Sequence, residues 1–208
     1  MIIYFRKYFI FCLFSLTIVF SRNYASFAGG FLRMGSSARS MAMGSGFTAE
    51  IDAGFAAYHN PASMVFLKKR QLGFSHHFLP LDRRFMAANL SVPLPPSASV
   101  GLAWVSAGVD KIDGRNIAGE HTQYLSTSEN AFIISFAQRI LPWFSAGLNV
   151  KILNHQLPMN TMDIAGKGMG MDFGIFIHSE NGPNLAFMIQ ELNSRYQWKT
   201  AKIFERGQ

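Results

Sequence analysis

The chain has 208 residues, of which 49% are hydrophobic and 15% are charged, and its formal net charge is +7. No run of about 20 apolar residues follows the N-terminus, which excludes a protein with several membrane-spanning helices. A soluble β-rich domain and a membrane β-barrel remain, since both place apolar residues at every second position of a strand. The 20 phenylalanines and 18 glycines, beside few charges, favour strands that face lipid.

The first 28 residues are typical of a secretory signal peptide. Two basic residues precede a short apolar core at 9–20, and Ala28 ends a small-residue cleavage site. An N-terminal membrane anchor is the alternative, although the core is short for a span. Cleavage after Ala28 removes three of the 19 basic residues and no acidic one, so 16 minus 12 leaves +4. Such a scattered charge predicts no nucleic-acid partner, and loss of Cys12 leaves no thiol for a disulfide or a metal site.

Residues 29–66 are rich in Gly, Ala, Ser and Met and show no strand period. Gly44 and Gly46 permit a positive φ angle or the close approach of another backbone. The pair Asn60-Pro61 ends whatever precedes it, because proline disfavours the helical conformation in the residue before it. Just before this pair, residues 55–58 are expected to form one short helical turn.

From residue 67 the sequence changes to short alternating segments, which predict an antiparallel all-β structure. In 144–152 apolar residues alternate with small or polar ones, and in 86–92 the same pattern repeats. The apolar face would meet lipid in a barrel, or form the core of a soluble sandwich. The expected strands span 71–79, 84–92, 98–107, 130–139, 143–154, 169–178 and 184–191.

The expected connections alternate between short turns and long loops after the first hairpin, with the long loops at 108–129 and 155–168. This alternation is typical of outer-membrane barrels. Phe85, Phe132 and Trp143 lie near strand ends and predict an aromatic belt at the membrane interface, although Trp143 fits a packed core equally well.

Between residues 31 and 64 the chain carries an Ala-Arg pair, a Met-Gly pair, an acidic residue and an Asn-Pro-Ala triplet. In this order and spacing they resemble the start of mature PorV/PorQ-like outer-membrane proteins, which are related to FadL-type barrels. A looser resemblance extends to about residue 200. It implies an antiparallel transmembrane β-barrel of FadL-like type with an N-terminal plug or hatch in its lumen. The motif residues of this plug, as structural or lumen-facing groups, are Arg33, Gly35, Arg39, Gly44, Gly46, Asp52, Asn60 and Pro61.

The resemblance divides the chain into a signal peptide (1–28), a plug-like segment (29–66) and barrel strands (67–208). Arg39 and Asp52 are expected to pair with polar groups of the lumen, because a charge in a partly dehydrated lumen needs a partner. His59 departs from the family pattern. The alternative is that 31–64 provides an ordinary first strand and turn.

The barrel is expected to be incomplete. Seven strands cannot close antiparallel, and FadL-like barrels look like structures of roughly fourteen strands, so the chain supplies about half. A strand at 38–48 would give eight, and 195–200 begins another strand-like alternation. A truncated gene, fragment or partial chain is therefore favoured, and such a fragment could lack function on its own.

No catalytic, cofactor-binding or metal-binding motif occurs in the sequence, so neither an enzyme nor a cofactor is expected. His76 and His77 would point to opposite faces of a strand and could not hold one ion together. The resemblance implies an exported outer-membrane protein that assists secretion or surface attachment of exported proteins, as in type IX secretion. Its partners would be outer-membrane lipid and secretion-system components or exported proteins. The alternatives are FadL-like passage of hydrophobic small molecules and a lipid-modifying barrel enzyme.

Overall fold

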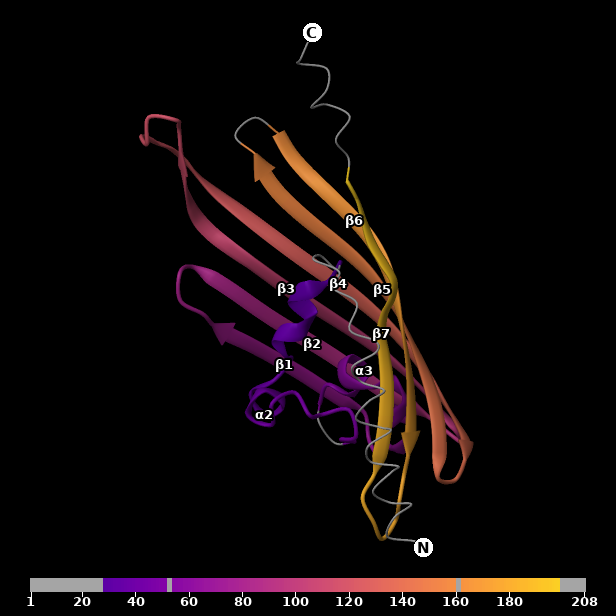
Figure 1. Ribbon diagram of the computed structural model, residues 1–208. Coiled ribbons are helices and arrows are strands. Elements are labelled where there is room, and N and C mark those ends of the chain that lie inside the picture. The colour runs from indigo at the N-terminus through magenta and orange to yellow at the C-terminus, as the bar shows by residue number, and fades with distance from the viewer. Residues whose placement is uncertain (1–27, 52–53, 160–161, 199–208) are drawn as a thin grey trace, which may run out of the picture.

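The computed structural model describes residues 28–51, 54–159 and 162–198. They form one antiparallel sheet of seven strands, in which each strand pairs with its neighbours in sequence (Figure 1). The sheet is not closed, and β1 and β7 are its edges. The expected all-β, antiparallel, barrel-like fold is thus confirmed. The strands are β1 (Gln71–Phe78), β2 (Arg83–Leu94), β3 (Ala98–Arg115), β4 (His121–Leu141), β5 (Phe144–Met159), β6 (Met162–Ile177) and β7 (Leu185–Trp198).

The residues before β1, which we call the N-terminal segment (28–67, without 52–53), contain four short helices. They are the 3₁₀ helix η1 (Gly30–Met34), α2 (Ala38–Ala42), α3 (Ala56–His59) and the 3₁₀ helix η2 (Pro61–Phe66). Ser37 and Ser40 form a reciprocal capping box at the start of α2. The helical turn expected before Asn60 is confirmed. The alternatives of an ordinary first strand and of a strand at 38–48 are wrong, because the segment forms short helices and residues 38–42 belong to α2.

The N-terminal segment contacts both edges of the sheet. Ser75 of β1 donates a hydrogen bond to the carbonyl of Ser36, and Ser194 of β7 donates one to the carbonyl of Ala28 (3.0 Å). A single segment that reaches both edge strands requires the sheet to curl around it. We call the face that it covers the concave face and the opposite one the convex face.

The two faces have opposite chemistry. One row of paired residues runs across the concave face from β2 to β6 and is buried: Ser91, Gly101, Ser135, Asn149 and Asp172. The adjacent row runs across the convex face from β1 to β7, and six of its seven side chains are exposed: Leu72, Leu90, Leu102, Ile134, Val150, Met171 and Leu192. Val150 is half-buried. The alternation in 86–92 and 144–152 therefore assigns the faces correctly, and the apolar rows do not form a core.

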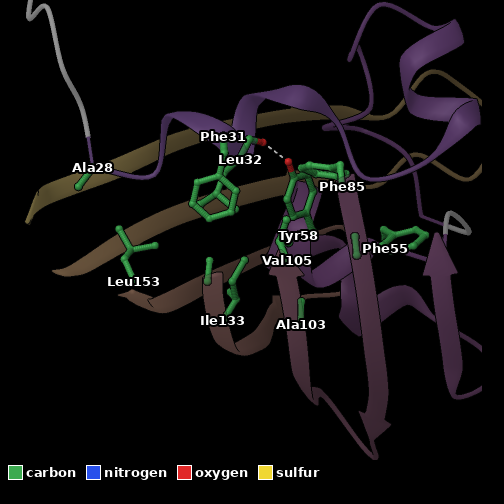
Figure 2. Close-up of a cluster of buried hydrophobic side chains, with 12 residues drawn as sticks. Ala28, Phe31, Leu32, Phe55, Tyr58, Phe85, Ala103, Val105, Ile133 and Leu153 are labelled. Atoms are coloured by element: carbon green, nitrogen blue, oxygen red, sulfur yellow. Dashed lines mark hydrogen bonds between the residues drawn. The ribbon is translucent and has the colours of Figure 1, made fainter. Parts of the chain in front are cut away.

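The hydrophobic core lies instead between the N-terminal segment and the concave face (Figure 2). Phe31, Leu32 and Tyr58 of the segment pack toward Ile133 and Leu153 of the wall. A second cluster joins Ala56, Ala57, Met64, Val65 and Leu67 to Ala137. The core thus depends on the segment, because the sheet has no second sheet to pack against among the described residues.

Several strands are longer than expected. The loop expected at 108–129 is mostly strand, since β3 continues to Arg115 and β4 begins at His121. The loop expected at 155–168 is likewise mostly strand within its described residues. These strand extensions contain many polar residues and no regular apolar alternation, so a search for apolar alternation overlooks them. Residues 195–198 belong to β7 and do not begin another strand. The strand continues past residue 191 through register shifts opposite Met171.

The aromatic belt is only partly as expected. Phe85 is fully buried against the N-terminal segment, so its assignment to the belt is wrong. Phe132 is more than half exposed but lies in the middle of β4, so its placement near a strand end is wrong. Trp143 is more than half exposed and lies in the turn between β4 and β5. His76 and His77 occupy opposite faces of β1, where His77 contacts the ring of Phe85 and His76 that of Phe78.

Candidate functional site

The close fit between the N-terminal segment and the concave face depends on glycines in the strands. A Cβ on Gly147 of β5 would lie 2.6 Å from the Ala62 nitrogen. One on Gly174 of β6 would lie 2.2 Å from Asn60 Oδ1, and one on Gly101 of β3 would lie 2.8 Å from the Ala57 Cβ. The helices α3 and η2 therefore rest directly on the backbone of three strands.

Asn60 joins the segment to the wall through its side chain, which is fully buried. Its Nδ2 donates to the carbonyls of Thr48 and of Ile175 in β6, at 3.2 Å each. Its Oδ1 accepts from the Ala62 nitrogen at 3.0 Å and so caps η2. Ser145 Oγ of β5 donates to the Ala62 carbonyl at 2.7 Å. The Asn-Pro-Ala motif is thus held by β5 and β6 together.

A buried ion pair lies beside this contact. Lys151 Nζ of β5 is 2.8 Å from Asp172 Oδ1 of β6, and the two side chains are 4% and 0% exposed. Asn149 Nδ2 donates to Asp172 Oδ2 (3.0 Å) and to the Ala57 carbonyl (3.1 Å). The Glu191 backbone nitrogen of β7 also donates to Asp172 (2.9 Å). These hydrogen bonds offset the desolvation of the Asp172 charge.

His59 is held between aromatic rings at the end of α3. Its Nε2 lies 2.8 Å from Ser36 Oγ, and its ring contacts Phe47 and Tyr58 with centroids 4.9 and 5.0 Å apart. Burial lowers the pKa of His59 to about 4. Burial likewise raises the pKa of Tyr58 well above its usual value, and its hydroxyl donates to the Leu32 carbonyl (Figure 2). Ser36 is fully buried, whereas His59 is half-buried and lines a pocket between the segment and β7.

The structure places the predicted motif residues in different environments. Arg33 pairs with Glu191 of β7 at 3.4 Å. Arg39 pairs with Glu50 of its own segment at 3.6 Å and lies over Phe47, so its partner belongs to the segment and not to the sheet. Its side chain is largely exposed and needs no partner in the wall.

The remaining motif residues are mainly backbone elements. Gly35 and Gly44 have φ angles of +88° and +60°, which favour glycine, whereas Gly46 has no positive φ. Pro61 begins η2 and packs against Gly147. Asp52 lies outside the described residues.

Sequence reasoning missed the pairing of Lys151 with Asp172. Lys151 falls on the polar side of the predicted alternation of β5, which is the available signal. Its partner depends on the register that pairs Asn149 with Asp172, and a single sequence does not specify a register between two strands.

A pocket of about 930 Å³, which we call the turn-end pocket, lies at the end of the sheet where the β2–β3, β4–β5 and β6–β7 turns gather. Val65, Phe66 and Leu67 of the segment line it together with Arg139 and His178 of the wall. Phe66 contacts the rings of Phe176 (5.4 Å) and His178 (4.8 Å). Pockets of about 530 and 500 Å³ lie between the segment and β7.

Within the described part of the chain, no three His, Cys, Asp or Glu side chains gather as a metal site would require. None of the helices formed by described residues has the length and hydropathy to cross a membrane. No protein-family model matches the chain, and no curated protein matches it.

Proposed function

We propose that this chain forms wall and plug of an outer-membrane β-barrel protein that assists the secretion or surface attachment of exported proteins. The observation that carries the proposal is the inverted chemistry of the two faces. Apolar side chains form the exposed convex row from Leu72 to Leu192, while polar and charged groups such as Asp172 are buried.

Energetics favour a lipid environment for the convex face. Soluble monomers rarely expose a contiguous apolar patch larger than a few hundred Å². The convex row crosses all seven strands, and flanking residues such as Phe136, Phe173 and Phe187 are also exposed. Each Å² of apolar surface removed from water contributes roughly 25 cal/mol. Contact with hydrocarbon would therefore stabilise the sheet in the orientation that it adopts.

The close fit of the N-terminal segment favours partner binding over passage. Glycine contacts, the buried Asn60 and the ion pair of Lys151 with Asp172 hold the segment against three or more strands. A plug fixed in this way closes the lumen beside β3, β5 and β6. The resemblance to PorV/PorQ-like proteins supports the same choice, since it implies a role in protein secretion.

Passage of a hydrophobic small molecule is the second candidate function. The pocket of about 530 Å³ beside β7 favours it, because Leu32, Ala186 and Met188 line this pocket together with the polar groups of Tyr58 and His59. A ligand there would contact the segment and the wall at once.

Cell fractionation with heat-modifiable gel mobility tests the membrane location. The chain should sediment with the outer membrane and migrate differently before and after boiling. Recovery of folded chain in the periplasmic fraction would contradict the location.

Deletion of the gene in the native host then separates the two functions. Exported proteins should accumulate in the periplasm and disappear from the cell surface, while uptake of labelled fatty acid stays unchanged. Loss of uptake with normal surface proteins would favour passage, and no change in either would contradict both functions.

A further inference from the structure

Basic residues are concentrated at the turn end of the sheet. Lys68, Lys69 and Arg70 connect the N-terminal segment to β1, and Arg139 lies near the end of β4. Glu180 is the acidic residue that lines the pocket. At the opposite end, residues 82–84 and 110–121 carry four basic and four acidic residues. Among these residues, positive charge exceeds negative charge at the turn end and is balanced by it at the opposite end.

The three consecutive basic residues are available for binding. Lys68, Lys69 and Arg70 are exposed, and none forms an ion pair with another described residue. By contrast, Arg84 pairs with Asp110 and Arg115 pairs with Asp113 at the other end. Acidic side chains of the chain thus pair with Arg84 and Arg115 at the other end, whereas the three basic residues at the turn end have no such partner among the described residues.

The turn-end pocket opens on the concave side. Gln71, Pro93 and Arg139 share the strand positions that face the N-terminal segment, and all three line the pocket. Its floor is apolar, from Val65 to Leu67, and its rim is cationic, with Lys68 and Lys69. An occupant would therefore need an apolar group between negative charges, and it would enter along the lumen and not from the convex face.

The cations of the rim do not converge on one point. Arg139 Nη2 already donates to the Pro96 carbonyl at 2.7 Å, and Lys68 and Lys69 follow one another on exposed backbone. A single phosphate is bound best by donors that converge on it. Separate cations around an apolar floor instead fit several carboxylates along an extended chain.

We propose that the turn-end pocket binds an acidic, extended peptide segment of a partner protein. Carboxylates of the segment pair with Lys68, Lys69 and Arg139, and an apolar side chain between them rests on Phe66 and Leu67. The inference rests on the proposed function, because it takes the sheet as the wall of a barrel and the N-terminal segment as its plug. The binding itself depends on the pocket alone.

Fluorescence anisotropy of a labelled peptide tests the proposal with the full chain in detergent micelles. The peptide is a decamer that alternates Asp and Glu with Leu, and the control decamer has Asn and Gln in their place. The acidic peptide should bind at least tenfold more tightly at 50 mM salt. Its affinity should fall steeply at 300 mM salt, because screening weakens exposed charge pairs.

Matched charge reversals locate the site. Lys68→Glu with Lys69→Glu should weaken the acidic peptide at least tenfold, while Arg83→Glu with Lys111→Glu, at the other end, should change its affinity less than twofold. Both variants change the net charge equally, and unchanged heat-modifiable mobility shows that each is folded. Equal loss in both variants, or equal binding of the neutral decamer, overturns the proposal.

Two competitors complete the test. Inorganic phosphate at 10 mM and vesicles with one third anionic phospholipid should leave the peptide bound, and displacement by either assigns the pocket to a different ligand and overturns the proposal. Failure of the membrane location would appear in fractionation and not in these affinities, so the two failures are distinguishable.

Discussion

Asn60 and the glycines opposite it hold the N-terminal segment directly against the backbone of the sheet. Replacement of Gly147 by alanine would place a Cβ 2.6 Å from the Ala62 nitrogen, which belongs to backbone and cannot rotate away. Overpacking of this kind costs about 1–3 kcal/mol. We expect Gly147→Ala to lower the free energy of unfolding by this amount in urea titrations followed by tryptophan fluorescence. Gly30→Ala, whose Cβ meets nothing within 4 Å, should change it much less.

Burial of His59 makes the stability of the folded chain depend on pH. Its pKa is about 4 in the folded chain and 6.5 ordinarily, so between these values the unfolded chain binds a proton that the folded chain does not. Stability should therefore be full above pH 6.5 and decline as pH falls toward 4, by on the order of 3 kcal/mol. Unfolding midpoints measured from pH 7.5 to 4 check this decline.

The variant His59→Gln isolates the histidine from the carboxylates that also titrate in this range. It cannot bind the proton, so its stability should fall less than that of the unmodified chain between pH 6.5 and 4.5. Parallel curves for the two proteins would show that His59 does not cause the dependence.

The ion pair between Lys151 and Asp172 is expected to show strong coupling. Removal of one partner leaves a buried charge, which costs about 3–5 kcal/mol. Lys151→Met and Asp172→Leu should each destabilise the chain by this amount in urea titrations. The double variant should cost clearly less than the sum, because it leaves neither charge buried. Additive losses would mean that the two side chains do not interact.

At the scale of elements, β5 shows what alternation can and cannot predict. The pattern from Phe144 to Ile152 assigns each residue to its face correctly, because side chains on a strand point to opposite sides in turn. It does not give the end of the strand at Met159, since the extension carries polar residues at both faces. The strands were therefore predictable in number and face, and less so in length.

In the N-terminal segment, the sequence predicted mainly where one helix ends and the next begins. Asn60-Pro61 ends α3 and starts η2, as expected from the restriction that proline imposes on the preceding residue. The partner of Arg33 was not predictable, because Glu191 lies 158 residues away and faces inward only through a positive φ angle of 59°. Contacts that depend on bulges and register require the folded structure.

The extended β3–β4 hairpin is expected to be separate from the stable part of the fold. Beyond Val109 the pair crosses a register shift at Lys111 and contains mostly exposed residues. Few buried apolar contacts mean low local stability. Replacement of residues 111–124 by Asn-Gly should leave the heat-modifiable mobility intact and shift the thermal midpoint by no more than a few degrees. A loss of folded chain would show that the hairpin tip supports the wall.

At the scale of the whole molecule, the sheet is open at both edges and has its core on one face only. β1 and β7 run in the same direction, because an antiparallel series of seven strands begins and ends alike. They cannot close the sheet by pairing antiparallel with each other. The described sheet therefore obtains its buried volume from the N-terminal segment on one face, and the apolar surface on its other face remains exposed.

Arginine on the convex face distinguishes lipid from water directly. Leu102 is 56% exposed in the middle of the convex row, and Ile117 is fully exposed at the tip of the β3–β4 hairpin. In a bilayer, Leu102→Arg should cost about 2–4 kcal/mol, as lipid-facing arginine does near the midplane of a barrel. Ile117→Arg should change stability by no more than about 0.5 kcal/mol, as exposed substitutions usually do. Urea titrations in liposomes measure both. Equal, small effects would mean that Leu102 faces water, and the membrane location would then be wrong.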